Sequence, residues 1–131
     1  MFSLLVHKDA LEDFEEIWQS APEDAARIAT LLQEIKSSQA LLDSLTEHGF
    51  GDAAVDGFNV KRWQEHWRDG KDLWRLKVWA LGRHMLDYRV IYAYIPGKQR
   101  YHVLGIVHRS FGYERNHPIT QRILAAYEDL H

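Results

Sequence analysis

Basic residues recur in a segment with strong strand character. Residues 73–94 read LWRLKVWALGRHMLDYRVIYAY, in which β-branched and aromatic residues predominate. Along a strand, alternation places Arg75 and Lys77 on one face and the apolar side chains between them on the other. Arg89 lies on the next predicted strand, which a turn joins to a third. One face of this sheet is therefore expected to meet a core and the other to bind an anion.

Further residues with catalytic chemistry follow the third strand. His108 and Arg109 end that strand, and Tyr113 and Arg115 come shortly after it. Metal-free RNA cleavage requires a base for the ribose 2′-hydroxyl, cations for the pentacoordinate phosphate and an acid for the leaving 5′-oxygen. Arg89 and Arg109 suit the charge-stabilising role, because guanidinium groups match phosphate geometry. His108 or Tyr113 is expected to assist proton transfer, although alternation separates His108 from Arg109 unless the strand has ended.

Aromatic residues surround these cations and are candidates for stacking on exposed bases; they are Trp63, Trp67, Trp79, Phe111 and Tyr113. Trp63 and Trp67 share a polar segment, so one is expected to pack down and the other to contact a partner. The extended piece before them adds two cations to the candidate RNA-binding residues, which are Lys61, Arg62, Arg75, Lys77 and Arg115.

Structural alternatives exist for several of these residues. Arg89 can pair with Asp72 or Asp87 in place of an anion, and His108 can be a sheet-end histidine without a catalytic role. Four cations on adjoining strands nevertheless repel one another unless an anion or a carboxylate compensates them. No histidine pair has the spacing of helical metal ligands, so we expect neither a metal site nor a cofactor.

Charge is distributed unevenly along the chain. The 131 residues carry a net charge of −3, yet residues 1–58 hold three basic and twelve acidic residues (3 − 12 = −9), and residues 59–131 hold thirteen and seven (13 − 7 = +6). This asymmetry predicts one face for a polyanion and another that repels it. Length, composition, the lack of cysteine and the lack of a long apolar run indicate a single domain over residues 1–131 in the reducing cytoplasm, not at a membrane.

Hydrophobic periodicity predicts an α+β fold. A short strand near residues 2–7 precedes two amphipathic helices, over 9–18 and 22–38. A short helix over 41–47, an extended piece near 58–63 and a turn through Asp69 and Gly70 follow. The remaining predicted elements are strands over 73–79, 87–95 and 101–108 and a helix from 118 to about 130. We therefore expect a small antiparallel sheet packed with an N-terminal helical hairpin and a C-terminal helix.

The succession LWRLKV, DYRVIYAY and YHVLGIVHRSFGY, closed by a helix, resembles the RelE/ParE superfamily of bacterial toxins over roughly residues 58–113. The resemblance implies a RelE-like fold and a toxin of a type II toxin–antitoxin pair. In the RelE-like branch such toxins cut messenger RNA in the ribosomal A site without metal. The family's phosphate-stabilising and proton-transfer positions then correspond to Arg75, Lys77, Arg89 and Arg109.

Two positions depart from the RelE pattern. Arg115 stands where RelE has a tyrosine, and Tyr113 is the nearby phenol that can substitute for it. His108 stands where RelE has a lysine. The acidic N-terminal half is a further difference, because ribosome-directed toxins are usually strongly basic.

The resemblance implies a ribosome-dependent mRNA endoribonuclease that leaves 2′,3′-cyclic phosphate and 5′-hydroxyl ends. The expected partners are a cognate antitoxin, the ribosome and mRNA, with no membrane and no sequence-specific DNA binding in the absence of the antitoxin. Two alternatives remain open at this point. One is a ParE-like inhibitor of DNA gyrase, and the other is an inert relative that acts only by binding.

Overall fold

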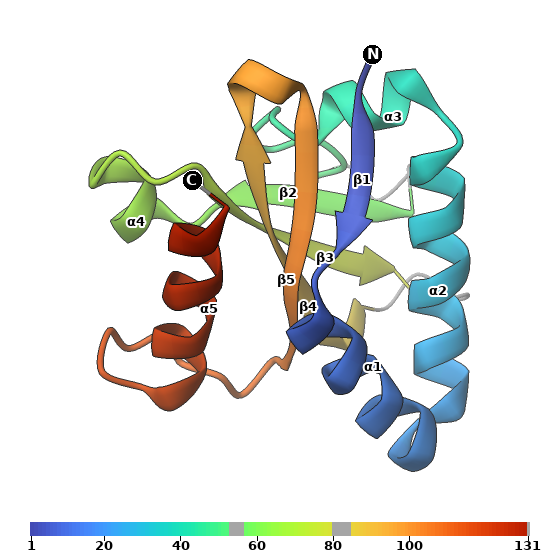
Figure 1. Ribbon diagram of the computed structural model, residues 1–131. Helices are drawn as coiled ribbons and strands as arrows, with labels where there is room; N and C mark the ends of the chain where they lie inside the picture. The colour runs from blue at the N-terminus through green and yellow to red at the C-terminus, as the bar shows by residue number, and fades with distance from the viewer. Residues whose placement is uncertain (53–56, 80–84, 131) are drawn as a thin grey trace.

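The computed structural model describes residues 1–52, 57–79 and 85–130, which are arranged around a five-stranded sheet (Figure 1). The strands are β1 (Ser3–Val6), β2 (Phe58–Arg62), β3 (Leu73–Trp79), β4 (Met85–Ile95) and β5 (Arg100–His108). The helices are α1 (Lys8–Ser20), α2 (Pro22–Lys36), α3 (Gln39–Ser44), α4 (Gln64–Arg68) and α5 (Pro118–Asp129), and a 3-10 turn, η1 (Pro96–Lys98), joins β4 to β5. None of these helices is long and apolar enough to cross a membrane.

The sheet is mixed, with strand order β1-β5-β4-β3-β2. Strands β2 to β5 pair antiparallel as expected, and the extended piece near residue 58 is the edge strand β2. The first strand differs from the expected pattern, because β1 runs parallel to β5 with Leu4 opposite Tyr101. No hairpin connects these two strands, so the chain is free to return in the parallel sense. The α+β class is confirmed.

An N-terminal helical hairpin covers one face of the sheet (Figure 1). The His7 side chain caps α1 by accepting a hydrogen bond from the backbone N–H of Asp9. Pro22 occupies the first turn of α2, where its missing N–H is not needed. The apolar stripes of both helices pack on β3, β4 and β5 in a core that includes Ile17, Ile28, Leu31, Ile35, Trp74, Leu76, Val78, Val90, Tyr92, Tyr101 and Val103.

Helix α5 packs on the opposite face (Figure 1). His117 caps this helix through the N–H of Ile119, and Pro118 begins it. Its buried side chains meet a second cluster that contains Trp63, Leu73, Ile91, Leu104, Val107, Phe111, Ile123 and Tyr127. This cluster occupies only part of the face. Further along β2, β3 and β4, the same face carries partly exposed basic side chains.

The short helix α4, between β2 and the expected turn, was not predicted. Five residues are too few for a periodic signal, and so short a helix depends on tertiary contacts. The expected turn follows it, and Gly70 adopts a left-handed φ of 82° there. Part of the loop expected over residues 49–57 lies outside the described residues.

Candidate functional site

The register of β2, β3 and β4 brings four basic side chains onto one sheet face. Lys77 lies directly opposite Arg89, and Lys61 lies directly opposite Arg75. Neighbouring strands are about 4.8 Å apart, so these side chains crowd one another. We call Lys61, Arg75, Lys77 and Arg89 the cationic cluster. Burial lowers the pKa of Lys77, and the charges of Arg75, Arg89 and Lys61 lower it further.

Arg89 is the most constrained member of the cationic cluster. Its Nε and Nη1 atoms are buried and have no hydrogen-bond partner among the described residues. Burial lowers its pKa, and the charges of Arg75 and Arg109 act in the same direction. A guanidinium without an acceptor in a half-buried position opposes folding. Such a group is suited to an incoming anion.

The structural alternatives for Arg89 are not realised, since both candidate carboxylates contact other groups. The Asp72 carboxylate accepts a hydrogen bond from Trp74 Nε1 at 2.8 Å. Asp87 Oδ1 lies 3.3 Å from Arg109 Nε, and both side chains are exposed. Within the described part of the chain, no ion pair joins Arg75, Lys77 or Arg89 to a carboxylate.

Lys61 differs from the other three members, because its Nζ lies 3.0 Å from Asp52 Oδ2. Asp52 also accepts a hydrogen bond from the Asn59 amide, and the bond from Lys61 is the main reason that the pKa of Asp52 is lowered. The charge of the cationic cluster is therefore compensated at its β2 edge and uncompensated over β3 and β4.

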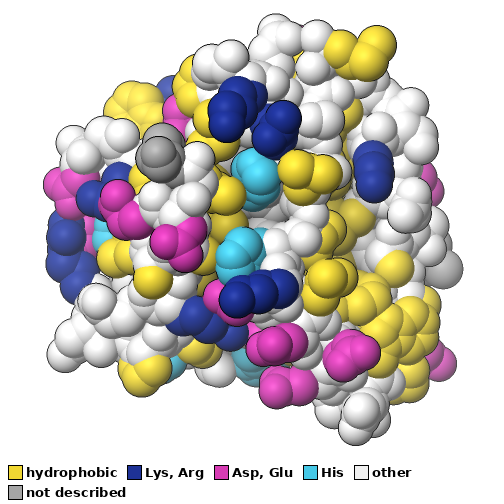
Figure 2. All heavy atoms as spheres, in the orientation of Figure 1, with side chains coloured by type: hydrophobic (Ala, Val, Ile, Leu, Met, Phe, Trp, Pro, Cys, Tyr) yellow, Lys and Arg dark blue, Asp and Glu magenta, His cyan; other side chains and the backbone are white. Residues whose placement is uncertain are grey.

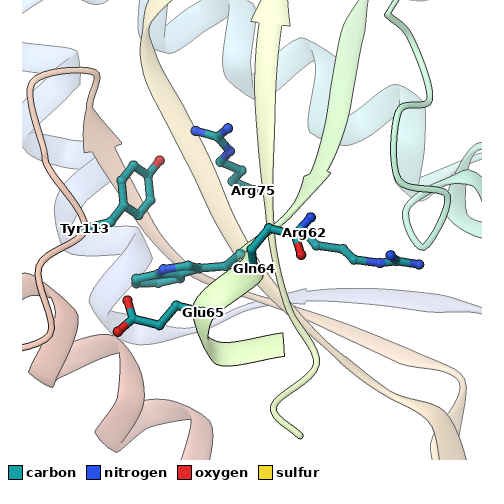
Figure 3. Close-up of a pocket in the computed structure, with 6 residues that line it drawn as sticks. Arg62, Gln64, Glu65, Arg75 and Tyr113 are labelled. Carbon is teal, nitrogen blue, oxygen red and sulfur yellow. The ribbon is translucent and has the colours of Figure 1, made fainter. Parts of the chain in front are cut away.

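Tyr113 approaches the cationic cluster from the loop after β5 (Figure 3). Its backbone adopts a φ of 61°, which an aromatic residue rarely occupies and which persists only under tertiary restraint. The ring packs on Phe111 at 4.6 Å and Trp63 at 5.1 Å between centroids, and Arg75 Cζ lies 5.7 Å from the ring centroid. The Tyr113 hydroxyl is buried without a hydrogen-bond partner among the described residues. This loop thus adds an unpartnered phenol beside the uncompensated cations.

Arg115 restrains the same loop through α4. Its guanidinium contacts the Glu65 carboxylate and lies 2.7 Å from Asp69 Oδ2. The hydrogen bond to Asp69 and then the bond to Glu65 raise the pKa of Arg115. Arg115 was predicted to bind RNA, whereas the structure places its charge in two internal ion pairs.

His108 lies on the other face of the sheet from Arg89. Strand β5 continues through His108, which pairs with Tyr88, and the two rings lie 5.5 Å apart. Its Nδ1 is 2.8 Å from Ser110 Oγ. Because Arg89 pairs with the preceding Val107, alternation separates His108 from the cationic cluster. The structure therefore brings Tyr113, and not His108, to the cationic cluster, where its ring lies against Arg75.

Arg62 also points away from the cationic cluster. It follows Lys61 on β2, so its side chain takes the opposite face, and Figure 3 shows its guanidinium directed away from Arg75 and Tyr113. There Arg62 Cζ lies 4.2 Å from the Trp67 ring centroid and 5.7 Å from that of Trp74.

A cavity of about 230 Å³ opens beside Tyr113 (Figure 3). Its lining residues are Arg62, Trp63, Gln64, Glu65, Arg75 and Tyr113. The contribution of α4 to this site was not predicted. The spacing of Glu65 and Asp69 was an available signal, because carboxylates at i and i+4 lie on one side of a helix and can grip one cation. No group of three potential metal ligands occurs among the described residues.

The α+β fold, with an open basic face on its sheet, is of the kind expected for the RelE/ParE superfamily. The family model described as ParE toxin of type II toxin-antitoxin system, parDE, matches residues 4–113, from β1 through Tyr113. The chain belongs to this family. It is therefore a type II toxin, and a cognate antitoxin is its partner. No curated protein and no solved structure gives a significant match.

Proposed function

We propose that this toxin cleaves messenger RNA on the ribosome without a metal ion. The observation that carries the proposal is the uncompensated group of Arg75, Lys77 and Arg89 with the Tyr113 ring against Arg75, the Tyr113 hydroxyl having no partner among the described residues. Three cations that repel one another, with buried donors left unpaired, are suited to a phosphate that supplies several acceptor oxygens.

The residues take distinct roles in this mechanism. Arg75 and Lys77 hold phosphates of the RNA strand, and Arg89 stabilises the added negative charge when the 2′-oxygen attacks phosphorus. The Tyr113 oxygen receives the 2′-hydroxyl proton while the phenol gives its own proton to the leaving 5′-oxygen, and its place on the face of the cationic cluster suits it to this role better than His108. Arg109 adds positive charge at the strand end. As the bond from phosphorus to the 5′-oxygen breaks, that oxygen takes up a proton and a 2′,3′-cyclic phosphate remains.

A second candidate function is inhibition of DNA gyrase, as in the ParE-like branch. The observation that favours it is the family match, whose description names ParE. In this case the cationic cluster contacts a protein or DNA surface and performs no chemistry.

Brief induced expression in a bacterium separates the two functions. Protein and DNA synthesis are followed by pulse labelling while 5′ ends of mRNA are mapped. RNA cleavage predicts a prompt fall in protein synthesis with new 5′ ends, and both effects disappear in Arg89→Ala. Lys98→Ala, which removes an exposed cation at the β4–β5 turn, serves as the matched control and should remain toxic. A fall in DNA synthesis that precedes any change in translation would reject RNA cleavage in favour of gyrase inhibition.

A further inference from the structure

Five aromatic residues were predicted to stack on bases, and all five lie in the described part of the chain. Trp67 is the one among them that is exposed. Its relative exposure is 41%, against 5% for Trp63 and 8% for Phe111. Trp79 and Tyr113 are partly buried. As expected, one tryptophan of the 63–67 pair packs down and the other remains at the surface. An exposed indole beside cations is able to offer its ring to a stacked base.

The surroundings of Trp67 are basic. Arg62 lies over its ring at 4.2 Å, and Arg68 and Lys71 are close in sequence. Of the three nearby acids, Glu65 and Asp69 are paired with Arg115, and Asp72 accepts a hydrogen bond from Trp74 Nε1. Figure 2 shows basic side chains gathered at the left edge of the molecule, where Figure 1 places α4. An aromatic surface among cations is the combination that proteins use to hold single-stranded nucleic acid.

A cavity of about 220 Å³ lies against Trp67. Trp67, Gly70, Lys71 and Asp72 line it, and Arg62 does not. A Cβ built at Gly70 would meet no atom within 4 Å, so the cavity is open at that residue. It is smaller than the pockets that hold drug-sized ligands and suits a group of the size of one base.

The helix that carries Trp67 follows the cationic cluster closely in sequence. Lys61 belongs to the cluster, Arg62 is the next residue and the last of β2, and α4 starts at Gln64. The first turn of α4, through Gln64 and Glu65, lines the same cavity as Arg75 and Tyr113, so a strand of RNA held over β3 can continue onto α4. Lys71 supplies a cation for its phosphate, and the Asp72 carboxylate lies at the edge of the cavity.

We propose that Trp67 and the cavity lined by Gly70, Lys71 and Asp72 form a base-stacking subsite for single-stranded RNA, outside the cleavage site. This subsite rests on the proposed function for the identity of its ligand. The indole face accepts any base, so the subsite adds affinity without strict sequence preference.

The test measures RNA binding separately from cleavage. A short single-stranded RNA with 2′-O-methyl groups lacks the attacking hydroxyl and cannot be cut, and its affinity is measured by fluorescence anisotropy. Trp67→Ala should weaken binding about 5- to 100-fold, the factor that stacking of one base supplies. The RNA should also quench tryptophan fluorescence less in Trp67→Phe than in the natural protein.

Trp18→Ala is the matched control, because Trp18 is exposed to 43% but lies on the acidic helix α1. It should bind RNA as tightly as the natural protein. Equal losses for both variants, or no loss for Trp67→Ala, would overturn the subsite. Loss of antitoxin binding with unchanged RNA binding would overturn it too, in favour of a protein contact. If Trp67→Ala alone loses affinity while the natural protein cuts no mRNA, the subsite stands and the proposed cleavage fails.

Discussion

Arg122 of α5 and Asp13 of α1 form a bidentate ion pair, with Nη1 3.0 Å from Oδ1 and Nη2 2.7 Å from Oδ2. Asp13 Oδ2 also accepts a hydrogen bond from the backbone N–H of Ile106 at 3.0 Å. Strand β1 ends at Val6, so β5 has no strand partner on that side beyond Val103. The Asp13 carboxylate thus replaces the missing strand and joins helices from the two faces of the sheet.

Asp13→Ala should lower the free energy of unfolding by about 2 kcal/mol, because Arg122 and the Ile106 N–H both lose their acceptor. The partial exposure of Arg122 keeps the cost below that of a fully buried pair. Urea denaturation measures the change, and Glu12→Ala on the exposed side of α1 is the control. Equal stability of the two variants would show that the pair contributes nothing.

Arg89→Met should stabilise the fold by about 1 kcal/mol while it removes toxicity. The substitution keeps much of the side-chain length but removes the guanidinium. That group carries a positive charge opposite Lys77, and two of its buried nitrogens have no acceptor among the described residues. Urea midpoints should therefore rise, and the difference should shrink at high salt, which screens the repulsion. A variant that is both less stable and non-toxic would mean that Arg89 is structural.

Glu65→Gln combined with Asp69→Asn should have the same effect as Arg115→Ala. Both changes remove the ion pairs between α4 and the loop that holds Tyr113 in its left-handed conformation. We expect faster hydrogen exchange in residues 110–117 and a turnover lowered about 10- to 100-fold, since a small misplacement of a reacting group has effects of this size.

If Arg115 bound RNA directly, freeing it from its two carboxylates would strengthen RNA binding. The double variant would then bind RNA more tightly than the natural protein, and Arg115→Ala would bind it less tightly. Arg68→Ala removes another cation of α4, one that forms no ion pair among the described residues, and it should leave the exchange of residues 110–117 unchanged.

Stability should fall as the pH drops below about 6.5, partly because of His66. This side chain is 1% exposed, and neither ring nitrogen has a hydrogen-bond partner among the described residues. Burial lowers its pKa in the folded state, so below the unfolded pKa the unfolded chain binds a proton that the native protein excludes. The pKa values of His48 and His102 are lowered also, chiefly by burial.

His66→Phe should therefore reduce, but not abolish, the loss of stability between about pH 7.5 and pH 5.5. Urea denaturation at the two pH values measures this difference for each protein. An unchanged pH dependence in the variant would show that the imidazole is protonated in the native state, or that it is not buried in solution.

Most of the fold was predictable because its elements are long and periodic. Strand alternation located β3, β4 and β5, and the apolar stripes with Pro22 and Pro118 located the main helices. The parallel pairing of β1 was not predictable from local pattern, because it joins residues about a hundred positions apart. Helix α4 was missed for the opposite reason, since one turn of helix carries no period.

The candidate site was predictable where it depended on alternation alone. Arg75, Lys77 and Arg89 lie together because each occupies a regular strand position. The side of His108 depended on whether β5 extends that far, and the structure shows that it does. The pairing of Arg115 with Glu65 and Asp69 depends on a loop and a helix that meet only in the folded protein.

The parallel pairing of β1 with β5 has a consequence for biosynthesis. β1 leaves the ribosome well before its partner strand β5, which begins only at Arg100. The hydrogen bond and ion pair of Asp13 likewise cannot form until Ile106 and Arg122 have been synthesised. Contacts between such distant segments form late, and chains emerge at about 5–20 residues per second. The residues between β1 and β5 therefore take on the order of ten seconds to synthesise, and the sheet of a newly made toxin can close only after that interval.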